Sequence, residues 1–359
     1  MTAHKRLGIL TSGGDAPGLN AAIRAIARTA MNRYGMEIIG IEQGYRGLIE
    51  NKYRILTERE LSGILARGGT ILGASREKPF RDKDWRKADG SGAVGSIKRN
   101  YKALRLDCLA VLGGNGSQTT ANMLAEEGLN IIGIPKTIDN DIVRNDMSFG
   151  FHTALDVATD AVDRLHSTAA SHNRVMVIEI MGHKAGWLTL YAGIAGGCDV
   201  IIIPEIPYRI ESIAAHLQER SNKGKDFSIV AVAEGARSFD EKEMDKKALK
   251  EVRKAMIGSI SYRIAKEIEA AAGLDTRVTV LGHLQRGGIP SGYDRLLATR
   301  FGAAAAEFAN AEHYGIMTAL KRGVIHPVPL RKIADKVKKV PAHHPMIIAA
   351  RNVGTCLGD

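Results

Sequence analysis

Short apolar runs alternate with longer amphipathic stretches along most of the chain. The apolar runs are rich in Val, Ile and Leu and nearly continuous, which is typical of strands buried on both faces of a parallel sheet. The predicted strands are Leu7–Leu10, Ile38–Ile41, Leu109–Leu112, Ile131–Ile134, Val175–Ile180, Val200–Ile203, Ile229–Ala233 and Val278–Leu281. The predicted helices are Leu19–Arg33, Thr119–Glu127, His152–Ala169, Ile210–Asn222, Lys247–Ala271 and Tyr293–Phe308. This alternation predicts an α/β fold with parallel-rich sheets.

The length and composition indicate a folded chain of two domains. At roughly 150 residues per domain, 359 residues suggest two of them. Hydrophobic residues make up 45% and charged residues 25%, which supplies a core and excludes a disordered chain. No low-complexity linker marks a boundary, so we expect the domains to exchange chain segments. The longest apolar runs are far shorter than the about 20 residues that cross a bilayer, and we expect no membrane partner.

The charge of the chain points to small anionic partners. The 50 Lys and Arg exceed the 39 Asp and Glu by 11, which gives a formal net charge of +11. Only 5% of the residues are aromatic, whereas nucleic-acid surfaces interleave aromatic side chains with cations, so we predict no nucleic-acid partner. Cys108, Cys198 and Cys356 have no metal-like spacing and cannot all pair, which favours a reducing cytoplasm.

Two glycine-rich loops, Thr11–Gly18 and Leu112–Thr119, each lie between a predicted strand and a predicted helix. Glycine lets the backbone approach an anion, and the N–H groups at a helix start point toward it. The first loop has Leu19-Asn20 where a P-loop needs Lys-Ser/Thr, and neither loop completes a G-x-G-x-x-G fingerprint. A tight turn explains either loop alone, but the pair favours a phosphate ligand.

A cluster of charged and hydroxyl side chains follows the predicted strand Ile131–Ile134. Lys136, Thr137, Asp139 and Asp141 lie within six residues. Phosphoryl transfer needs positioning, charge neutralisation and often a carboxylate that accepts the hydroxyl proton. Asp139 suits that base, Thr137 suits a group that orients a phosphate, and Lys136 suits a balancing charge. A structural turn rich in Asp and Asn is the alternative interpretation.

Basic side chains gather in loops of the second half of the chain. His283 and Arg286 lie in a glycine-flanked loop after a predicted strand, and Ser171–Arg174 and Met181–Lys184 form two more basic loops. The planar fork of an arginine matches phosphate geometry. The loops therefore predict an anion pocket, although a histidine at a strand end is also common as a structural residue.

Three segments resemble the signature sequences of 6-phosphofructokinases. They are Ile9–Gly18, Pro135–Asp141 and Leu281–Gly288, and the likeness runs from about Arg6 to about Arg300. The resemblance implies two Rossmann-like three-layer α/β domains with the active site in the cleft between them. It also implies a phosphoryl-donor domain of residues 1–150 plus about 285–331, and a sugar-phosphate domain of residues 151–284 plus about 332–359.

The resemblance implies transfer of a phosphoryl group to the C1 hydroxyl of fructose 6-phosphate in glycolysis, with Mg²⁺ as cofactor. By motif position, Asp139 is the general base with Thr137 beside it. The residues implied to bind the sugar phosphate are Thr137, Asp139, Arg174, Met181, Gly182, His183, Glu234, Arg277, His283 and Arg286. Those implied to line the donor site are Gly13, Arg76, Gly114, Asn115, Gly116 and Ser117, with Asn115 and Asp141 as metal ligands.

The resemblance also bears on assembly. In the bacterial enzymes two arginines of the sugar-phosphate site come from a neighbouring subunit, and Arg174 and Arg277 correspond to them. It therefore implies a homotetramer, or a homodimer.

Regulation is less close to the family pattern. Arg24, Arg28 and Arg54 match basic positions of the bacterial effector site, but His166 stands where another arginine is typical. We therefore expect weak or absent activation by ADP.

Two active-site positions depart from the family pattern. Asn115 stands where the family has the acid of a Gly-Gly-Asp-Gly-Ser loop, so Asp141 or water would carry more of the metal binding. His183 stands where the family has an arginine that is thought to stabilise the transferring phosphoryl group, and its charge depends on pH. Lys136 or Lys184 would compensate for that loss.

Two positions bear on the phosphoryl donor. In this family a glycine at the position of Gly116 accompanies ATP, because an aspartate there crowds the α-phosphate. A lysine at the position of Lys136 is typical of diphosphate users and of a mixed group of ATP users. Because lack of space excludes a donor more firmly than charge attracts one, we predict ATP. The alternatives are a reversible diphosphate-dependent enzyme and, given Asn115 and His183, a non-catalytic nucleotide- or sugar-phosphate-binding protein.

Overall fold

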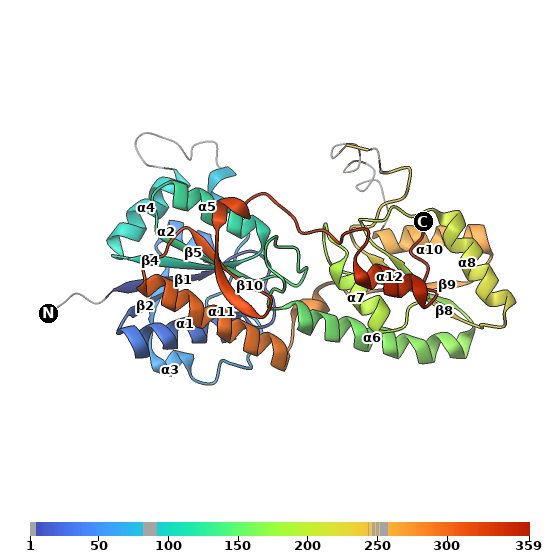
Figure 1. Ribbon diagram of the computed structural model, residues 1–359, viewed down its shortest axis with the longest axis horizontal. Coiled ribbons are helices and arrows are strands. Elements are labelled where there is room, and N and C mark those ends of the chain that lie inside the picture. Colours follow the sequence, from blue (N-terminus) through green and yellow to red (C-terminus); the bar gives the residue numbers. More distant parts are fainter. Residues whose placement is uncertain (1–4, 82–91, 243, 246–247, 249–250, 252–257) are drawn as a thin grey trace. The chain divides into compact units, whose positions relative to one another are not determined.

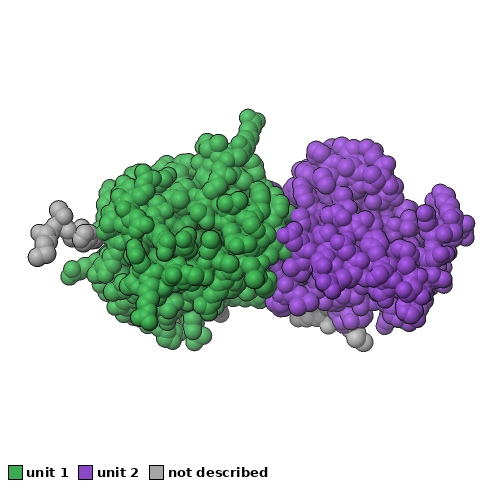
Figure 2. All heavy atoms as spheres, turned by 90° about the horizontal axis from the view of Figure 1, so that it is seen from below, with its two compact units in different colours: residues 1–138, 142–153, 286–337 green, residues 139–141, 154–285, 338–359 purple. Residues whose placement is uncertain are grey.

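In the computed structural model the described residues are 5–81, 92–242, 244, 245, 248, 251 and 258–359. The chain divides into two compact units (Figure 2). Unit 1 comprises residues 1–138, 142–153 and 286–337, and unit 2 comprises residues 139–141, 154–285 and 338–359. Each unit is thus assembled from three separate segments of the chain.

Unit 1 contains a seven-stranded sheet in the order β11-β10-β5-β4-β1-β2-β3 (Figure 1). The five inner strands are parallel, and the edge strands β3 and β11 pair antiparallel with their neighbours. The strands are β1 (Arg6–Thr11), β2 (Glu37–Ile41), β3 (Tyr53–Leu56), β4 (Cys108–Gly113), β5 (Ile131–Pro135), β10 (Ile316–Lys321) and β11 (Val324–Pro329).

Helices cover both faces of this sheet, because alternate strand residues point to opposite sides. Leu7 and Ile9 of β1 pack in a core that includes residues of α1 and α11. Leu10 packs in a second core with residues of α2, α4 and α5. The helical elements are α1 (Leu19–Tyr34), α2 (Gly44–Glu50), α3 (Glu58–Leu61), η1 (Pro79–Arg81), α4 (Ala93–Ala103), α5 (Asn115–Glu126), α11 (Gly292–Asn310) and η3 (Leu330–Lys332).

Unit 2 contains an all-parallel four-stranded sheet in the order β7-β8-β6-β9. Val177 and Val232 share a core with residues of α8 and α10. The alternate residues Ile201 and Ala231 meet Gly193 of α7, so this sheet also carries helices on both faces. The remaining elements are β6 (Val175–Ile180), β7 (Val200–Ile202), β8 (Ser228–Ala233), β9 (Thr276–Val280), α6 (Phe151–His172), α7 (Trp187–Ala195), α8 (Ile210–Asn222), α10 (Ile260–Ala272), η2 (Gly282–Arg286) and α12 (Pro345–Asn352).

The predicted α/β fold with parallel-rich sheets is confirmed, and every predicted strand is present. The helix predicted over Thr119–Glu127 begins four residues earlier, at Asn115, because Gly114 acts as its N-cap. Of the helix predicted over Lys247–Ala271, the part from Ile260 is helical, and much of the preceding part lies outside the described residues. None of the described helices has the length and hydropathy needed to cross a membrane.

The apolar pattern missed three strands of unit 1, the inner strand β10 and the two antiparallel edge strands β3 and β11. Tyr53 and Ile55 of β3 are 44% and 50% exposed, so that strand lacks a continuous apolar run. β11 contains Pro327 and Pro329, which cannot donate ladder hydrogen bonds and therefore weaken a strand prediction. The two prolines are tolerated in β11 because an edge strand forms ladder hydrogen bonds on one side only.

Candidate active site

The first glycine-rich loop leaves β1 and enters α1 through two left-handed glycines. Gly13 has φ of +83° and Gly18, the N-cap of α1, has φ of +96°, conformations that residues with a Cβ rarely adopt. The Ser12 N–H donates to Leu112 O at 2.9 Å, and the Gly13 N–H donates to Ser75 O at 2.9 Å. The loop is therefore fixed between the end of β4 and the segment around Ser75.

The second glycine-rich loop is shorter than the sequence predicted, because only Gly114 separates β4 from α5. Asn115, Gly116 and Ser117 form the first turn of α5 rather than a loop. The N–H groups of such a turn and the helix dipole attract anions. The Ser117 hydroxyl donates to Ser12 Oγ at 3.0 Å, which joins the two glycine-rich segments.

Two glycines of the second segment differ in whether the fold requires a residue without a Cβ. A Cβ on Gly113 would lie 2.3 Å from Ser117 Cβ, so packing requires glycine there. A Cβ on Gly116 would meet no described atom within 4 Å, and its φ lies outside the left-handed region. The fold therefore does not require glycine at Gly116, and the space beside it is open to a ligand.

Lys136 links the first loop to the end of β5. Its ammonium donates to Ser12 O at 3.1 Å and to Gly14 O, and its Nζ would lie 3.8 Å from a Cβ on Gly13. The residue is only 3% exposed. A buried cation bonded to these carbonyls holds the loop in place and makes its surroundings more positive.

Arg286 contacts the same loop. Its Nη1 donates to Asp15 O at 2.9 Å and would lie 2.7 Å from a Cβ on Gly14. The guanidinium thus lies against Gly14, where a side chain would displace it. Its role in binding the sugar phosphate stays a prediction, since this hydrogen bond ties Arg286 to the first glycine-rich loop.

A basic hollow of about 600 Å³ adjoins Ser75, whose carbonyl binds the first loop. Its lining consists of Arg46, Ser75, Arg76, Glu77, Lys78 and Arg81. Small-molecule sites have roughly this volume, and a lining with four cations suits a polyphosphate. The family motifs point to Arg76 alone. The other cations belong to no motif, and folding alone gathers them from α2 and from the segment that includes η1.

The charged turn after β5 surrounds a left-handed asparagine. Asn140 has φ of +49° and is 4% exposed, and Asp141 is 6% exposed. Asp139 is half-buried. The Thr137 N–H donates to Phe149 O at 3.3 Å, which fixes the start of the turn. Asp139 is therefore more exposed than the two residues that follow it, although its Oδ1 atom is itself buried.

In unit 2, Glu234 joins the segments that follow β6 and β8. Its Oε1 accepts from the His183 N–H at 2.7 Å and from the Gly182 N–H at 3.3 Å. The positive φ values of Gly182 and His183, 152° and 49°, bring both N–H groups to this carboxylate. β6 lies between β8 and β9, and all three strands are parallel, so their carboxyl ends lie on the same side of the sheet. The exposed His283, in η2 after β9, therefore lies on the same side as Gly182, His183 and Glu234.

Arg174 and Arg277 lie at the opposite end of that sheet. Arg174 precedes β6, and Arg277 is the second residue of β9. Both bind Asp275, at 2.6 Å and 2.5 Å. Desolvation raises the pKa of Asp275, but the bonds from the two arginines outweigh it and leave the pKa below its ordinary value. The six residues of β6 span roughly 20 Å, so these arginines are a strand length away from His183.

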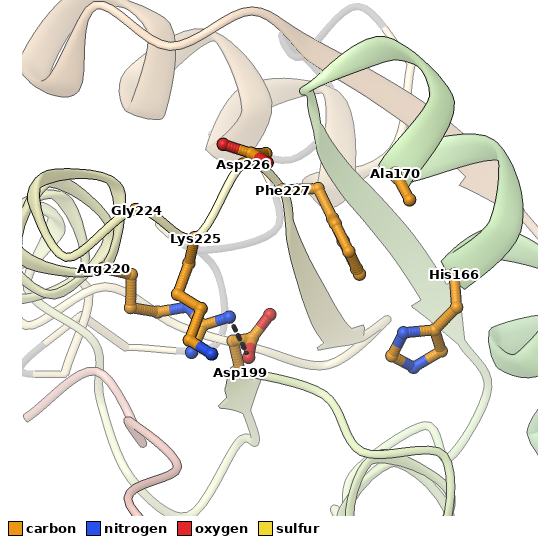
Figure 3. Close-up of a pocket in the computed structure, with 8 residues that line it drawn as sticks. All are labelled: His166, Ala170, Asp199, Arg220, Gly224, Lys225, Asp226 and Phe227. Carbon is orange, nitrogen blue, oxygen red and sulfur yellow. Dashed lines mark ion pairs between the residues drawn. The ribbon is translucent and has the colours of Figure 1, made fainter.

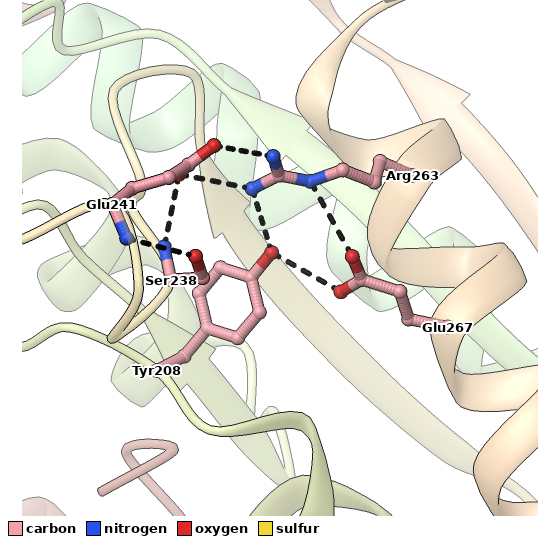
Figure 4. A network of polar contacts seen from close by, with 5 residues as sticks. All are labelled: Tyr208, Ser238, Glu241, Arg263 and Glu267. Atoms are coloured by element: carbon pink, nitrogen blue, oxygen red, sulfur yellow. Dashed lines mark hydrogen bonds and ion pairs between the residues drawn. The ribbon is translucent and has the colours of Figure 1, made fainter. Parts of the chain in front are cut away.

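A buried polar network holds the segment after β8 (Figure 4). Arg263 of α10 forms an ion pair with Glu241 and donates to the Tyr208 hydroxyl at 2.8 Å, which in turn donates to Glu267 at 3.2 Å. The Ser238 N–H donates to Glu241 at 3.0 Å. The side chain of Glu241 is 5% exposed, so its charge depends on this arginine. Burial raises the pKa of the Tyr208 phenol and keeps it protonated as a donor.

The sequence matches the family described as Phosphofructokinase over residues 6–309. A Spirochaeta thermophila protein named ATP-dependent 6-phosphofructokinase is 60% identical over 99% of this chain and 98% of its own length. The chain belongs to the phosphofructokinase family. A relative of the same name from Propionibacterium freudenreichii subsp. shermanii is 49% identical over 99% of each chain. The solved phosphofructokinase of Saccharomyces cerevisiae is 32% identical with a TM-score of 0.78 over 91% of this chain, which spans 45% of the yeast chain.

The fold of this phosphofructokinase family member gathers most of the predicted site residues in three places, and Thr137, Asp139 and Asp141 lie in the turn after β5. The first glycine-rich loop, the start of α5 and Lys136 lie together in unit 1, with Arg76 in the adjoining hollow. The carboxyl ends of β6, β8 and β9 in unit 2 are followed by Met181–His183, Glu234 and His283, respectively. Arg174 and Arg277 form the third group, at the other end of that sheet.

His166, the residue that departs from the family's effector pattern, lines a pocket of about 390 Å³ in unit 2 (Figure 3). Its ring lies 2.7 Å from Gly196 O. Arg220 of the same pocket is paired with Asp199 at 2.7 Å, so the charge of this arginine is already neutralised. Weak or absent activation by ADP stays a prediction.

The oxygen ligands predicted for a metal are not part of a larger cluster. Among the described residues no group of three or more His, Cys, Asp or Glu is arranged to hold an ion. Mg²⁺ at phosphate sites commonly takes only one or two carboxylates and keeps water and substrate oxygens. An amide oxygen and a carboxylate are ligand types of that kind, and Asn115 and Asp141 as metal ligands stay a prediction.

Proposed function

We propose that this chain is an ATP-dependent 6-phosphofructokinase of glycolysis, located in the cytoplasm. It transfers the γ-phosphoryl group of ATP to the C1 hydroxyl of fructose 6-phosphate and forms fructose 1,6-bisphosphate and ADP. The observation that carries this proposal is the 60% identity, over nearly the full length of both chains, to a relative that bears the name of that activity. The cytoplasmic location is supported by the three cysteines, all free thiols.

Unit 1 supplies the donor side of the proposed reaction. The phosphates of ATP bind at the backbone of Ser12–Gly14 and at the first turn of α5, and the rest of the nucleotide extends toward the hollow that contains Arg76. These groups are positioned before substrate arrives, because Ser117, Lys136 and Ser75 already bond the loop. Preorganised donors of this kind stabilise the charge that develops on a transferring phosphoryl group.

Asp139 acts as the general base. It accepts the proton of the C1 hydroxyl as the C1 oxygen forms a bond to the γ-phosphorus, and the bond from that phosphorus to the β–γ bridging oxygen breaks. Thr137 orients the phosphoryl group beside it. When Mg²⁺ is bound, with Asn115 and Asp141 as its protein ligands, it neutralises charge on the phosphate oxygens.

Unit 2 supplies the sugar-phosphate side. The sugar phosphate of the same chain is bound by Met181–His183, Glu234 and His283, which follow the ends of β6, β8 and β9, together with Arg286. Arg174 and Arg277 lie a strand length away, so they serve the site of a neighbouring subunit. This separation supports a shared site and hence a homotetramer or homodimer, the assembly that the resemblance to the bacterial enzymes implies.

The donor is ATP because of the open space at Gly116, which leaves room for the α-phosphate. A reversible, diphosphate-dependent reaction is the second candidate, favoured by the buried ammonium of Lys136 at the first loop. A larger donor needs space as well as charge, whereas diphosphate needs only the charge. The glycine therefore carries the choice of donor.

Lys136 also compensates for the weaker charge of His183, where the family has an arginine. We expect Lys136→Gly to lower kcat with ATP by about tenfold or more, because it removes a preorganised cation from the donor loop. The measurement is the initial rate at saturating ATP and fructose 6-phosphate. Lys184→Gly is the matched control, since Lys184 is exposed and adjoins His183. An unchanged rate for Lys136→Gly would mean that Lys136 does not compensate for the weaker charge of His183. A larger loss of rate for Lys184→Gly would assign that compensation to Lys184.

The proposed activity is tested by initial rates on fructose 6-phosphate with Mg²⁺, comparing ATP and diphosphate at equal concentration. Turnover with ATP alone is the expected result. Turnover with diphosphate that is equal or faster would make the lysine decisive and the reaction reversible in the cell. Binding of both substrates without turnover would favour a non-catalytic sensor.

A further inference from the structure

The segment that begins at Lys338 runs beside the Asp139–Asp141 turn within unit 2. The Lys338 N–H donates to Asp141 O at 2.7 Å, and its Nζ donates to Asn140 Oδ1 at 3.1 Å. One residue therefore binds both residues that follow Asp139, although nearly 200 positions separate them in the sequence. This lysine belongs to none of the sequence motifs described above.

The turn needs such an anchor for two reasons. Asn140 has a left-handed backbone, which asparagine adopts more easily than most residues with a Cβ but which its surroundings still stabilise. The residue is also 4% exposed, so its amide oxygen must be paired inside the protein.

Lys338 is itself held from both sides. The Trp187 indole N–H donates to Lys338 O at 2.8 Å, and the lysine Nζ lies 5.3 Å from the centre of the indole ring. The His344 ring packs edge-on against the same indole, 5.0 Å away, and Glu205 accepts from the Val340 N–H at 3.0 Å. A lysine is normally mobile, but here its backbone and its ammonium are both restrained.

We propose that Lys338 is a positioning residue for the catalytic turn. It fixes the left-handed Asn140 and thereby sets the direction in which Asp139 presents its carboxylate. It acts through Asn140 and does not itself contact substrate. This inference rests on the proposed function only in naming Asp139 as the base; the contacts that carry it lie within unit 2.

The first test is the pair Lys338→Met and Lys338→Arg. Lys338→Met keeps the backbone bond to Asp141 and the length of the side chain but loses the bond to Asn140. We expect kcat to fall about tenfold with KM for fructose 6-phosphate changed by less than about twofold, since a displaced base slows the chemical step. Lys338→Arg retains a donor and should recover most of the rate. Lys336→Met is the matched control, because Lys336 is exposed and its ammonium donates to Lys332 O within its own turn.

The second test shows whether Lys338 acts through Asn140. Asn140→Gly allows the same positive φ but removes the amide acceptor. In that background Lys338→Met should cause no further loss of kcat. A loss as large as in the natural sequence, a change in KM alone, or a failure of Lys338→Arg to recover activity would overturn the proposal.

Hydrogen exchange separates this inference from the proposed function. The two variants Lys338→Met and Lys336→Met are compared when their melting temperatures are equal. Amide exchange in a peptide covering residues 137–143 should then be faster in Lys338→Met. This measurement needs no turnover. If the natural protein does not phosphorylate fructose 6-phosphate, the proposed function fails, and the exchange result alone then supports or overturns the positioning role. Unchanged exchange in the turn overturns it.

Discussion

Replacing Asp139 by Asn is expected to lower kcat by about 10²–10⁴-fold and to leave binding of fructose 6-phosphate nearly unchanged. The amide has the shape of the carboxylate, so the turn around Asn140 keeps its geometry. It cannot accept the proton of the C1 hydroxyl, however, and the attacking oxygen loses its base. The rate is measured as ADP release at saturating substrates, and sugar-phosphate binding is measured by calorimetry.

Asp156→Asn is the matched control for this substitution. Asp156 is exposed on α6, and removing a surface charge there should change the rate by less than about twofold. A full rate in Asp139→Asn would remove Asp139 from the chemistry. Loss of sugar-phosphate binding together with the rate would instead assign Asp139 to substrate binding.

Replacing Gly116 by Asp is expected to lower kcat/KM for ATP by at least about 100-fold, because like charges brought together at a binding site cost several kcal/mol. The side chain meets no described atom within 4 Å at its Cβ, so the fold itself should accept it. The new carboxylate would occupy the space proposed for the α-phosphate. Initial rates at varied ATP concentration measure the effect, and the melting temperature shows that the protein is folded.

Gly116→Ala is the control for backbone and space. It adds the same Cβ without the charge, and we expect most of the ATP-dependent rate to remain. An equal loss in Gly116→Ala and Gly116→Asp would mean that helix geometry, rather than crowding of the donor, explains the glycine. If Gly116→Asp keeps full ATP-dependent activity, Gly116 does not determine the donor.

Most of the inner strands were predictable because they are buried on both faces, although β10 was missed. A strand such as β4, whose six residues are all buried, is a short and nearly continuous apolar run, which is typical of parallel sheets. The edge strands β3 and β11 carry exposed residues and prolines, and their pairing depends on a neighbour that sequence periodicity does not reveal. The start of α5 at Asn115 was not predicted because its first turn is polar and contains a glycine, which is unlike an apolar helical pattern.

The candidate site was predictable only where its residues are contiguous. The cluster of Lys136, Thr137, Asp139 and Asp141 lies within six residues, so its chemistry can be recognised from the sequence alone. The contacts that position these residues cannot be recognised in that way. Lys338 reaches Asn140 across nearly 200 residues, and Ser117 reaches Ser12 across 105.

By itself, the sequence determined the class of fold, the family resemblance and the chemical types at the site, because buried strands and short motifs are local patterns. Only the tertiary structure decided which residues meet. It gathered the two glycine-rich segments around Lys136, separated Arg174 and Arg277 from His183 by the length of a strand, and placed Lys338 at the catalytic turn. These arrangements depend on strand order and on chain segments that return from afar, and neither is encoded in a local pattern.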